Sequence, residues 1–167
     1  MNSSSHRRKA AAALLMIAQL GQAQWFFGNL YEAVVRIPER IAAESGSHLR
    51  SERPSLSTLF RPGSPVRYYL PTAPVTLAAA IAAVIAGWDE PQDRKWLGAS
   101  AASTVSGAML TAYVVRQINY KLFFAAQPLA AAEQQELLRR WHRLNKLRLT
   151  ASGVAWLTGQ RVAAVSR

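Results

Sequence analysis

The chain contains no cysteine among its 167 residues. This absence excludes a disulfide framework, a thiol nucleophile and a metal site built from thiolates. Histidine is also scarce, with three residues, and one candidate histidine beside one acid cannot supply the three or four ligands of a typical metal site. The sequence has no glycine-rich phosphate loop, nucleophile elbow or dinucleotide fingerprint either. Nucleotide-dependent chemistry and serine-hydrolase chemistry are therefore not expected.

Charge is nearly absent from four apolar segments, which cover residues 10–35, 71–88, 96–115 and 149–165. Each is close to the roughly 20 residues that a helix needs to cross a hydrocarbon core. The mean hydropathy of the whole chain is only +0.01, because the charges lie between these segments. We therefore predict an all-α fold, an integral membrane four-helix bundle that is multi-pass in the cell membrane, over a soluble bundle.

The domain boundaries follow from the same pattern. Residues 1–9 are polar and basic, and we expect a disordered tail there. Residues 10–167 are expected to form the four-helix transmembrane domain, with Pro38 kinking or interrupting the first helix. An amphipathic helical segment over residues 131–147 is expected to merge into the last helix.

Basic residues outnumber acidic ones by twenty to nine, which gives a net charge of +11. They flank the apolar segments, and no basic-aromatic module or helix-turn-helix pattern accompanies them. We therefore expect a lipid bilayer with anionic headgroups as the partner and no nucleic acid. The connections after the first and third apolar segments carry most of the basic residues. This bias favours a cytoplasmic location for both connections, although the cluster in the N-terminal tail argues for the opposite orientation.

Glu32 is the only acid inside any of the four apolar segments. Gln22, Trp25, Asn29, Glu32 and Arg36 follow one another at spacings of three and four, so they share one face of a helix. A polar stripe on an apolar helix is expected to face the bundle interior. Glu32 can pair with Arg36 one turn later, which is a purely structural reading. The functional reading is a carboxylate that removes a proton from a substrate C–H or O–H group.

A second group lies near the end of the third helix and consists of Tyr113, Arg116, Asn119 and Tyr120. Asn119 is placed to orient Glu32 or to bind a substrate oxygen. Arg116 is placed to stabilise an enolate or phenolate. The structural alternative is that Arg116 extends to the membrane interface while Asn119 pairs with backbone groups.

A third group precedes the last helix. Trp141, Asn145 and Arg148 share one helical face, and His142 is offset from it but can meet Asn145. The structural alternative for His142 is an exposed histidine on a basic helix. His6 and His48 lie in polar stretches and are weaker candidates.

Several short motifs together resemble the anthrone oxygenase-like family of small four-helix integral membrane proteins. The resemblance spans about residues 10–165. In chain order the motifs are Gly28-x-x-Tyr31-Glu32, Leu59-Phe60-Arg61, a turn bracketed by Trp88 and Trp96, Asn119, and Trp141-x-x-x-Asn145-x-x-Arg148.

The resemblance implies a cofactor-independent oxygenase that acts on a hydrophobic, aromatic, polyketide-like small molecule in natural product biosynthesis. By that resemblance Glu32, Asn119, Trp141 and Arg148 occupy recurring family positions. The chain departs from the family at Asn145, where many members carry histidine, and at Gln117, where many carry proline.

The residues predicted to be catalytic are Glu32, His142 and Asn119. The predicted substrate-binding residues are Asn29, Tyr31, Arg36, Arg116, Trp141, Asn145 and Arg148. Three alternatives stay open: a non-catalytic membrane accessory or scaffold subunit, a transporter component, and a haem- or copper-binding redox protein. No cofactor is otherwise expected, and a homo-oligomer stays open as well.

Overall fold

The computed structural model of the protein describes residues 3–46, 65–124 and 129–165. Within these ranges every secondary-structure element is helical, which confirms the all-α prediction. The Leu59-Phe60-Arg61 motif and His48 lie outside the described residues. The elements are α1 (Ser3–Val34), α2 (Ile37–Gly46), α4 (Pro65–Tyr69), α5 (Ala73–Gly87), α6 (Pro91–Val114), the π-helix η1 (Val115–Asn119), α7 (Tyr120–Phe124) and α8 (Ala131–Val165).

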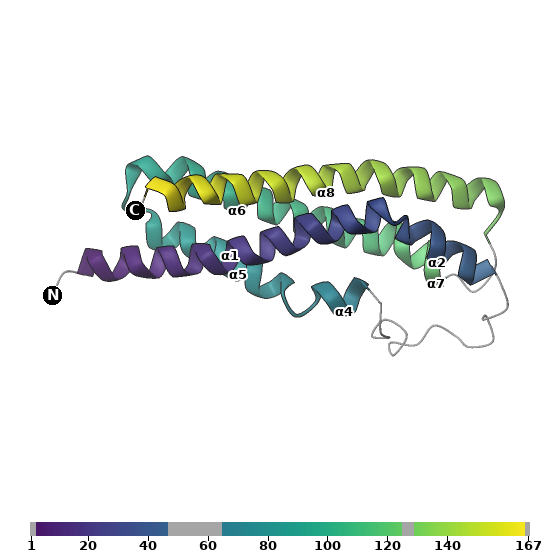
Figure 1. Ribbon diagram of the computed structural model, residues 1–167, viewed down its shortest axis with the longest axis horizontal. Coiled ribbons are helices and arrows are strands. Elements are labelled where there is room, and N and C mark those ends of the chain that lie inside the picture. Colours follow the sequence, from purple (N-terminus) through teal and green to yellow (C-terminus); the bar gives the residue numbers. More distant parts are fainter. Residues whose placement is uncertain (1–2, 47–64, 125–128, 166–167) are drawn as a thin grey trace.

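Four helices form an elongated bundle, in which α1 and α6 each contact both α5 and α8 (Figure 1). The 32 residues of α1 and the 35 of α8 extend for about 48 Å and 52 Å at 1.5 Å per residue. With 15 residues α5 is much shorter. The short helix α4 precedes α5 and lies beside α1 (Figure 1). At that end of the bundle α2 and α7 pack together and both lie near the start of α8. The predicted amphipathic segment and the last helix are one continuous helix, α8.

The break between α1 and α2 confirms that Pro38 interrupts the first helix. The chain leaves the helix after Val34, and Arg36 has a φ of 52°, in the left-handed region that non-glycine residues seldom adopt. Pro38 lacks a backbone N–H, and its ring would clash with the carbonyl of Val34 in a continuous helix, so α1 ends at Val34. A new helix then starts at Ile37.

The predicted third helix runs from Pro91 to Phe124, but near its C-terminal end it contains the π-helical turn η1. Such turns are rare and frequently occur at functional sites. Ile118 of η1 joins Val114, Leu122, Leu137 and Trp141 in an apolar core between this rod and α8.

Small residues allow α1 and α5 to approach closely. Ala18, Ala79 and Ala80 form a buried cluster between these helices. At Gly21, a Cβ would lie 1.8 Å from the Thr76 Oγ1, so glycine is required for this packing.

Residues 3–9 belong to α1, where the sequence suggests a disordered tail. Two ion pairs hold this end of α1 against the turn between α5 and α6. The Arg7 guanidinium lies 2.6 Å from the Asp89 carboxylate, and Arg8 pairs with Glu90. Opposite charges that are 82 residues apart in the chain thus join the start of α1 to this turn.

By length and composition, one of the described helices is long and apolar enough to cross a membrane, over His6–Val34. The α5 helix is also apolar but shorter. Four membrane-crossing helices were expected, and one of the described helices meets this criterion.

Candidate functional site

The predicted polar stripe on α1 faces the bundle interior, as its spacing indicates. Gln22 is fully buried, and Trp25 and Asn29 are 7% and 4% exposed. Gln22 Nε2 donates to the hydroxyls of Ser100 and Thr104 on α6, at 3.1 and 2.9 Å. These bonds tie α1 to α6. Asn29 and Glu32, toward the C-terminal end of α1, face other elements.

Glu32 pairs with Arg148 of α8 across the interior. The Glu32 Oε2 and the Arg148 Nη1 are 4.0 Å apart, and their side chains are only 12% and 6% exposed. Arg148 Nε donates to the Thr111 hydroxyl at 3.1 Å, and that hydroxyl donates to the Gly107 carbonyl at 2.9 Å. The ion pair is longer than a hydrogen bond, so terminal nitrogens of Arg148 remain available to a ligand.

Arg36 does not take the expected position beside Glu32. Because α1 ends at Val34, the one-turn spacing that would join Glu32 to Arg36 does not apply, and Arg36 is exposed. The carboxylate therefore has a partner from a distant part of the sequence.

Tyr69 of α4 completes this cluster. Its hydroxyl packs against Gly28, where a Cβ would lie 2.3 Å from the Tyr69 oxygen. Burial, and next the nearby Glu32 carboxylate, raise the pKa of the Tyr69 phenol well above its usual range. The phenol is therefore neutral and able to donate a hydrogen bond. It has no hydrogen-bond partner of ordinary geometry among the described residues.

Four further buried polar atoms on the same stripe and the facing part of α8 have no hydrogen-bond partner among the described residues. They are the Gln22 Oε1, the Trp25 Nε1, the Asn29 Oδ1 and the Asn145 Oδ1. Asn145 Nδ2 donates to the Asn29 carbonyl at 3.1 Å, which fixes its orientation. Buried polar groups are nearly always hydrogen-bonded, so such a concentration of unpaired atoms indicates a place for a bound ligand or water.

His142 and Trp141 lie apart from Glu32. His142 Nε2 is 2.7 Å from the Glu39 carboxylate of α2, and its ring meets Trp141 edge-on at 5.2 Å. Trp141 is 2% exposed within the apolar core. Arg148 lies six positions after His142 along α8, which is about 9 Å. This second pair holds α2 to α8.

The remaining predicted residues fall into two groups. Tyr31 and Arg116 are exposed on the outside of the bundle. Asn119 is half-buried on η1 and its Oδ1 is a buried acceptor with no partner in the part of the chain that the structure describes. The structure thus brings Asn29, Glu32, Asn145 and Arg148 together and leaves Tyr31, Arg36 and Arg116 outside.

The sequence reasoning missed Tyr69, Thr111 and Glu39. In the sequence Tyr69 lies in the connection before the second apolar segment, and its sequence signal is Gly28, which creates the space for the phenol. Thr111 lies in an apolar stretch in which a single hydroxyl carries little information. Within the described ranges, no three histidine or carboxylate side chains lie close enough together to hold a metal ion.

The fold and site define an all-helical bundle with a carboxylate, a guanidinium and a phenol gathered in its interior. A family model described as anthrone oxygenase matches residues 64–158, which is more than half of the chain. The chain belongs to the anthrone oxygenase family, which confirms the predicted resemblance. The match includes Tyr69, Thr111 and Arg148 but not Glu32, so the resemblance before residue 64 stays a prediction. No curated protein and no solved structure matches the chain.

Proposed function

We propose that this protein is a membrane-embedded oxygenase that oxidises a hydrophobic, phenolic aromatic substrate without a cofactor. The observation that carries the proposal is the Glu32–Arg148–Tyr69 cluster, which α1, α8 and α4 assemble in the bundle interior. Family membership supports an oxygenase, and the cluster supplies the base and the anion-stabilising groups that such chemistry requires.

In the proposed reaction Glu32 removes a proton from an activated ring methylene. The electrons delocalise through the conjugated ring system onto its carbonyl oxygen, which becomes a phenolate-like oxygen. Arg148 and neutral Tyr69 stabilise that anion, because preorganised donors in a site shielded from water are most effective on developing charge.

The electron-rich carbanion then reduces dioxygen to a peroxide bound to the same carbon. The second C–H proton leaves, the O–O bond breaks, and water departs as the new carbonyl forms. The net change is CH₂ plus O₂ to C=O plus H₂O, so four electrons pass from substrate to oxygen and the proton held by Glu32 returns in the water.

The unpaired amide oxygens of Asn29 and Asn145 support a phenolic substrate. Both are buried acceptors, so a ligand that fills the site gains most if it carries hydroxyl donors. An aromatic ring bearing hydroxyl groups and one carbonyl meets both the acceptors and the donors of this cluster.

The same proposal places the bundle in the cell membrane as a multi-pass protein. Large apolar side chains are exposed on the outward faces of all four bundle helices, while the polar groups described above are buried. An apolar exterior around a polar interior suits a bilayer better than water, and it gives a hydrophobic substrate access from the lipid. The exposed residues include Leu20 and Val34 of α1, Ile85 of α5, Met109 of α6 and Leu157 of α8.

Oxygen consumption by purified Glu32→Gln with a phenolic anthrone tests the proposal. We expect turnover to fall by roughly 100-fold or more, since a positioned base contributes about 10²–10⁴. Glu136→Gln is the matched control, because Glu136 is exposed on α8 and pairs with Arg139 nearby, at 2.9 Å. Unchanged turnover in Glu32→Gln would rule out the base role and favour the accessory-subunit alternative.

A further inference from the structure

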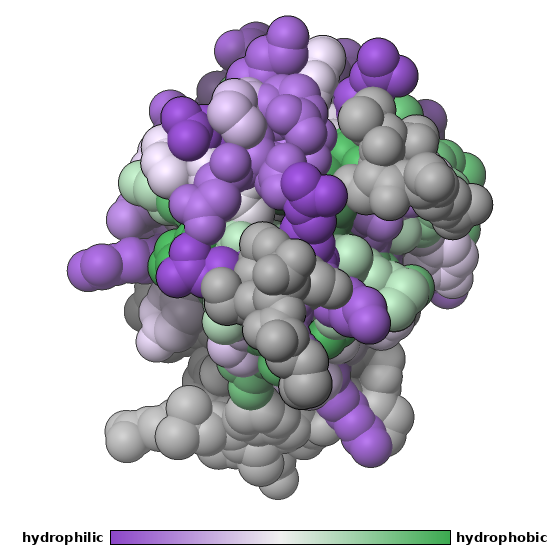
Figure 2. Space-filling model, turned by 90° about the vertical axis from the view of Figure 1, so that its left-hand side faces the viewer, coloured by the Kyte–Doolittle hydropathy of each residue, from purple (hydrophilic) through white to green (hydrophobic). Residues whose placement is uncertain are grey.

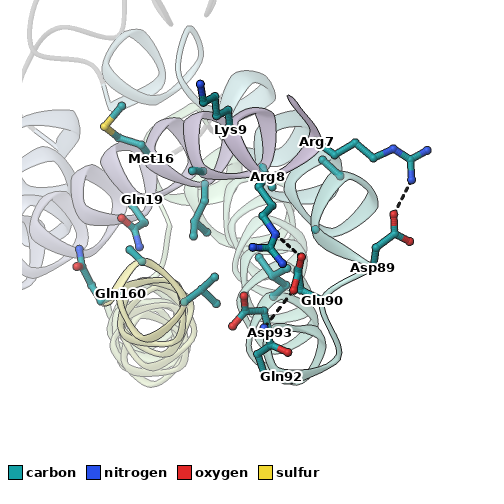
Figure 3. A pocket seen from close by; sticks show the side chains of 18 residues that line it. Arg7, Arg8, Lys9, Met16, Gln19, Asp89, Glu90, Gln92, Asp93 and Gln160 are labelled. Atoms are coloured by element: carbon teal, nitrogen blue, oxygen red, sulfur yellow. Dashed lines mark hydrogen bonds and ion pairs between the residues drawn. The ribbon is translucent and has the colours of Figure 1, made fainter. Parts of the chain in front are cut away.

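A second site lies at the other end of the bundle, where the chain begins. A cavity of about 700 Å³ opens between the first turns of α1, the α5–α6 turn and the end of α8 (Figure 3). Along α1 it is about 36 Å from Glu32, counted from Arg8 at 1.5 Å per residue. None of the residues of the interior cluster lines it. Figure 2 shows this end of the molecule, where hydrophilic side chains predominate.

The charged groups that line the cavity sum to zero. Three bases come from α1 and three acids from the α5–α6 turn and the start of α6: Arg7, Arg8, Lys9, Asp89, Glu90 and Asp93. Two ion pairs join Arg7 to Asp89 and Arg8 to Glu90. This balance disfavours a ligand with net charge of either sign and suits a zwitterion.

Asp93 differs from the other acids. It is 8% exposed, and Figure 3 shows its carboxylate directed into the space between α6 and α8. No hydrogen bond or ion pair is formed by this carboxylate within the described residues. Its oxygens are not sealed off like the unpartnered atoms of the interior cluster, so a donor that enters the cavity can reach them.

The walls around Asp93 are apolar, apart from one buried amide donor. Leu15, Leu97 and Val162 form a buried cluster that borders the cavity. Gln19 Nε2 is buried with no partner among the described residues. The guanidinium of Arg8 extends from α1 to Glu90 at the start of α6 (Figure 3).

We propose that this cavity binds the headgroup of a phospholipid with a primary amine, a phosphoethanolamine. Asp93 accepts hydrogen bonds from the ammonium, and Arg8 contacts the phosphate. The start of an acyl chain lies against Leu15 and Val162. The inference relies on the membrane location proposed above and not on the oxygenase reaction.

Two observations favour an ethanolamine over other headgroups. A quaternary choline is usually held by aromatic rings, and no aromatic side chain lines this cavity. A primary ammonium has three N–H donors for a carboxylate, which choline lacks. An anionic glycerol headgroup has neutral hydroxyl donors and would place no cation beside the Asp93 carboxylate.

The test uses the unaltered full chain, purified in detergent, and measures lipid binding by native mass spectrometry. Phosphatidylethanolamine is compared with its mono-, di- and trimethylated forms and with phosphatidylglycerol. We expect affinity to fall with each methyl group, by about tenfold or more from ethanolamine to choline, and glycerol to bind more weakly than ethanolamine. Equal binding of ethanolamine and choline, or tighter binding of glycerol, would overturn the proposal.

Two substitutions locate the effect. Asp93→Asn should remove the preference for ethanolamine, whereas Asp89→Asn, an exposed acid of the same turn, should retain it. A preference unchanged in Asp93→Asn would refute the assignment, and if that variant does not fold, the methylation series still decides.

Glycerophosphoethanolamine distinguishes a lipid site from a site for the soluble headgroup. We expect it to compete only at concentrations far above those of the lipid, because it lacks acyl chains. Equal affinity would overturn the lipid assignment. Glu32→Gln should leave lipid binding unchanged, so failure of the oxygenase proposal would not be mistaken for failure of this one.

Discussion

Arg148 is the residue on which the interior site most depends, because its guanidinium contacts both Glu32 and Thr111 while almost fully buried. Removing one partner of a buried ion pair leaves the other charge uncompensated. Arg148→Met should therefore destabilise the protein by about 3–5 kcal/mol. Adding Glu32→Gln should recover most of that loss, and melting temperatures of the two single variants and the double variant measure it. Additive losses would mean that the two charges do not interact.

Substitution of Tyr69 should affect turnover without affecting the stability of the fold. Its hydroxyl has no hydrogen-bond partner of ordinary geometry, so Tyr69→Phe should change the free energy of unfolding by less than about 1 kcal/mol. If the phenol stabilises the substrate anion, turnover should fall by roughly 100-fold. Tyr31→Phe is the control, because Tyr31 is exposed. Normal oxygen consumption by Tyr69→Phe would remove the phenol from the mechanism.

Removing the charge of Asp93 should stabilise the protein, whereas removing that of Arg148 should destabilise it. Burial, and next the neighbouring Glu90, raise the pKa of its carboxyl, while Arg8 lowers it in part. The folded state therefore holds this proton more tightly than the unfolded chain. The stability from that proton is complete at low pH and is lost as pH rises through the folded-state value.

At neutral pH the charged Asp93 thus destabilises the lipid-free protein. Asp93→Asn should raise its Tm, by no more than about 2–4 °C, the shift that one kcal/mol produces in a chain of this size. Scanning calorimetry without added lipid tests this, with Asp89→Asn as the reference. A lower Tm would show that Asp93 stabilises the fold through contacts of its own.

At the scale of elements, the break between α1 and α2 removes Arg36 from the helical face that carries Glu32. Arg36 occupies a left-handed conformation that costs a non-glycine residue about 1–2 kcal/mol. Arg36→Gly should be neutral or stabilising by about 1 kcal/mol. Because Arg36 is exposed, the same variant should keep normal oxygen consumption. A large loss of turnover would restore Arg36 to the substrate-binding role that the sequence suggested.

The helices and the buried face of α1 were predictable because both depend on local periodicity. The spacing from Gln22 to Glu32 alone assigns these residues to one side, and burial confirms it. The Arg148 partnership was not predictable, because the one-turn rule assumes a helix that continues through Arg36. The location of Tyr69 beside Glu32 depends on tertiary packing against Gly28, which periodicity does not encode.

For the whole molecule, the distribution of polarity links the two ends of the bundle to a bilayer. Exposed apolar side chains surround its length, and ion pairs lie at the end that carries the α5–α6 turn. The absence of cysteine makes this testable with single introduced thiols on a silent background. Three exposed positions suit this test: Leu157 on the side of the bundle, Gln92 at the start of α6 and Arg139 near the start of α8.

A membrane-impermeant maleimide applied to intact cells should distinguish these positions. Leu157→Cys should stay unlabelled even after permeabilisation, because lipid covers it. The basic connections favour a cytoplasmic location for the start of α8, so Gln92→Cys should be labelled in intact cells and Arg139→Cys only after permeabilisation. Labelling of all three thiols alike would contradict membrane insertion. The reverse order for Gln92 and Arg139 would keep the insertion and invert the orientation, in agreement with the Arg7–Lys9 cluster.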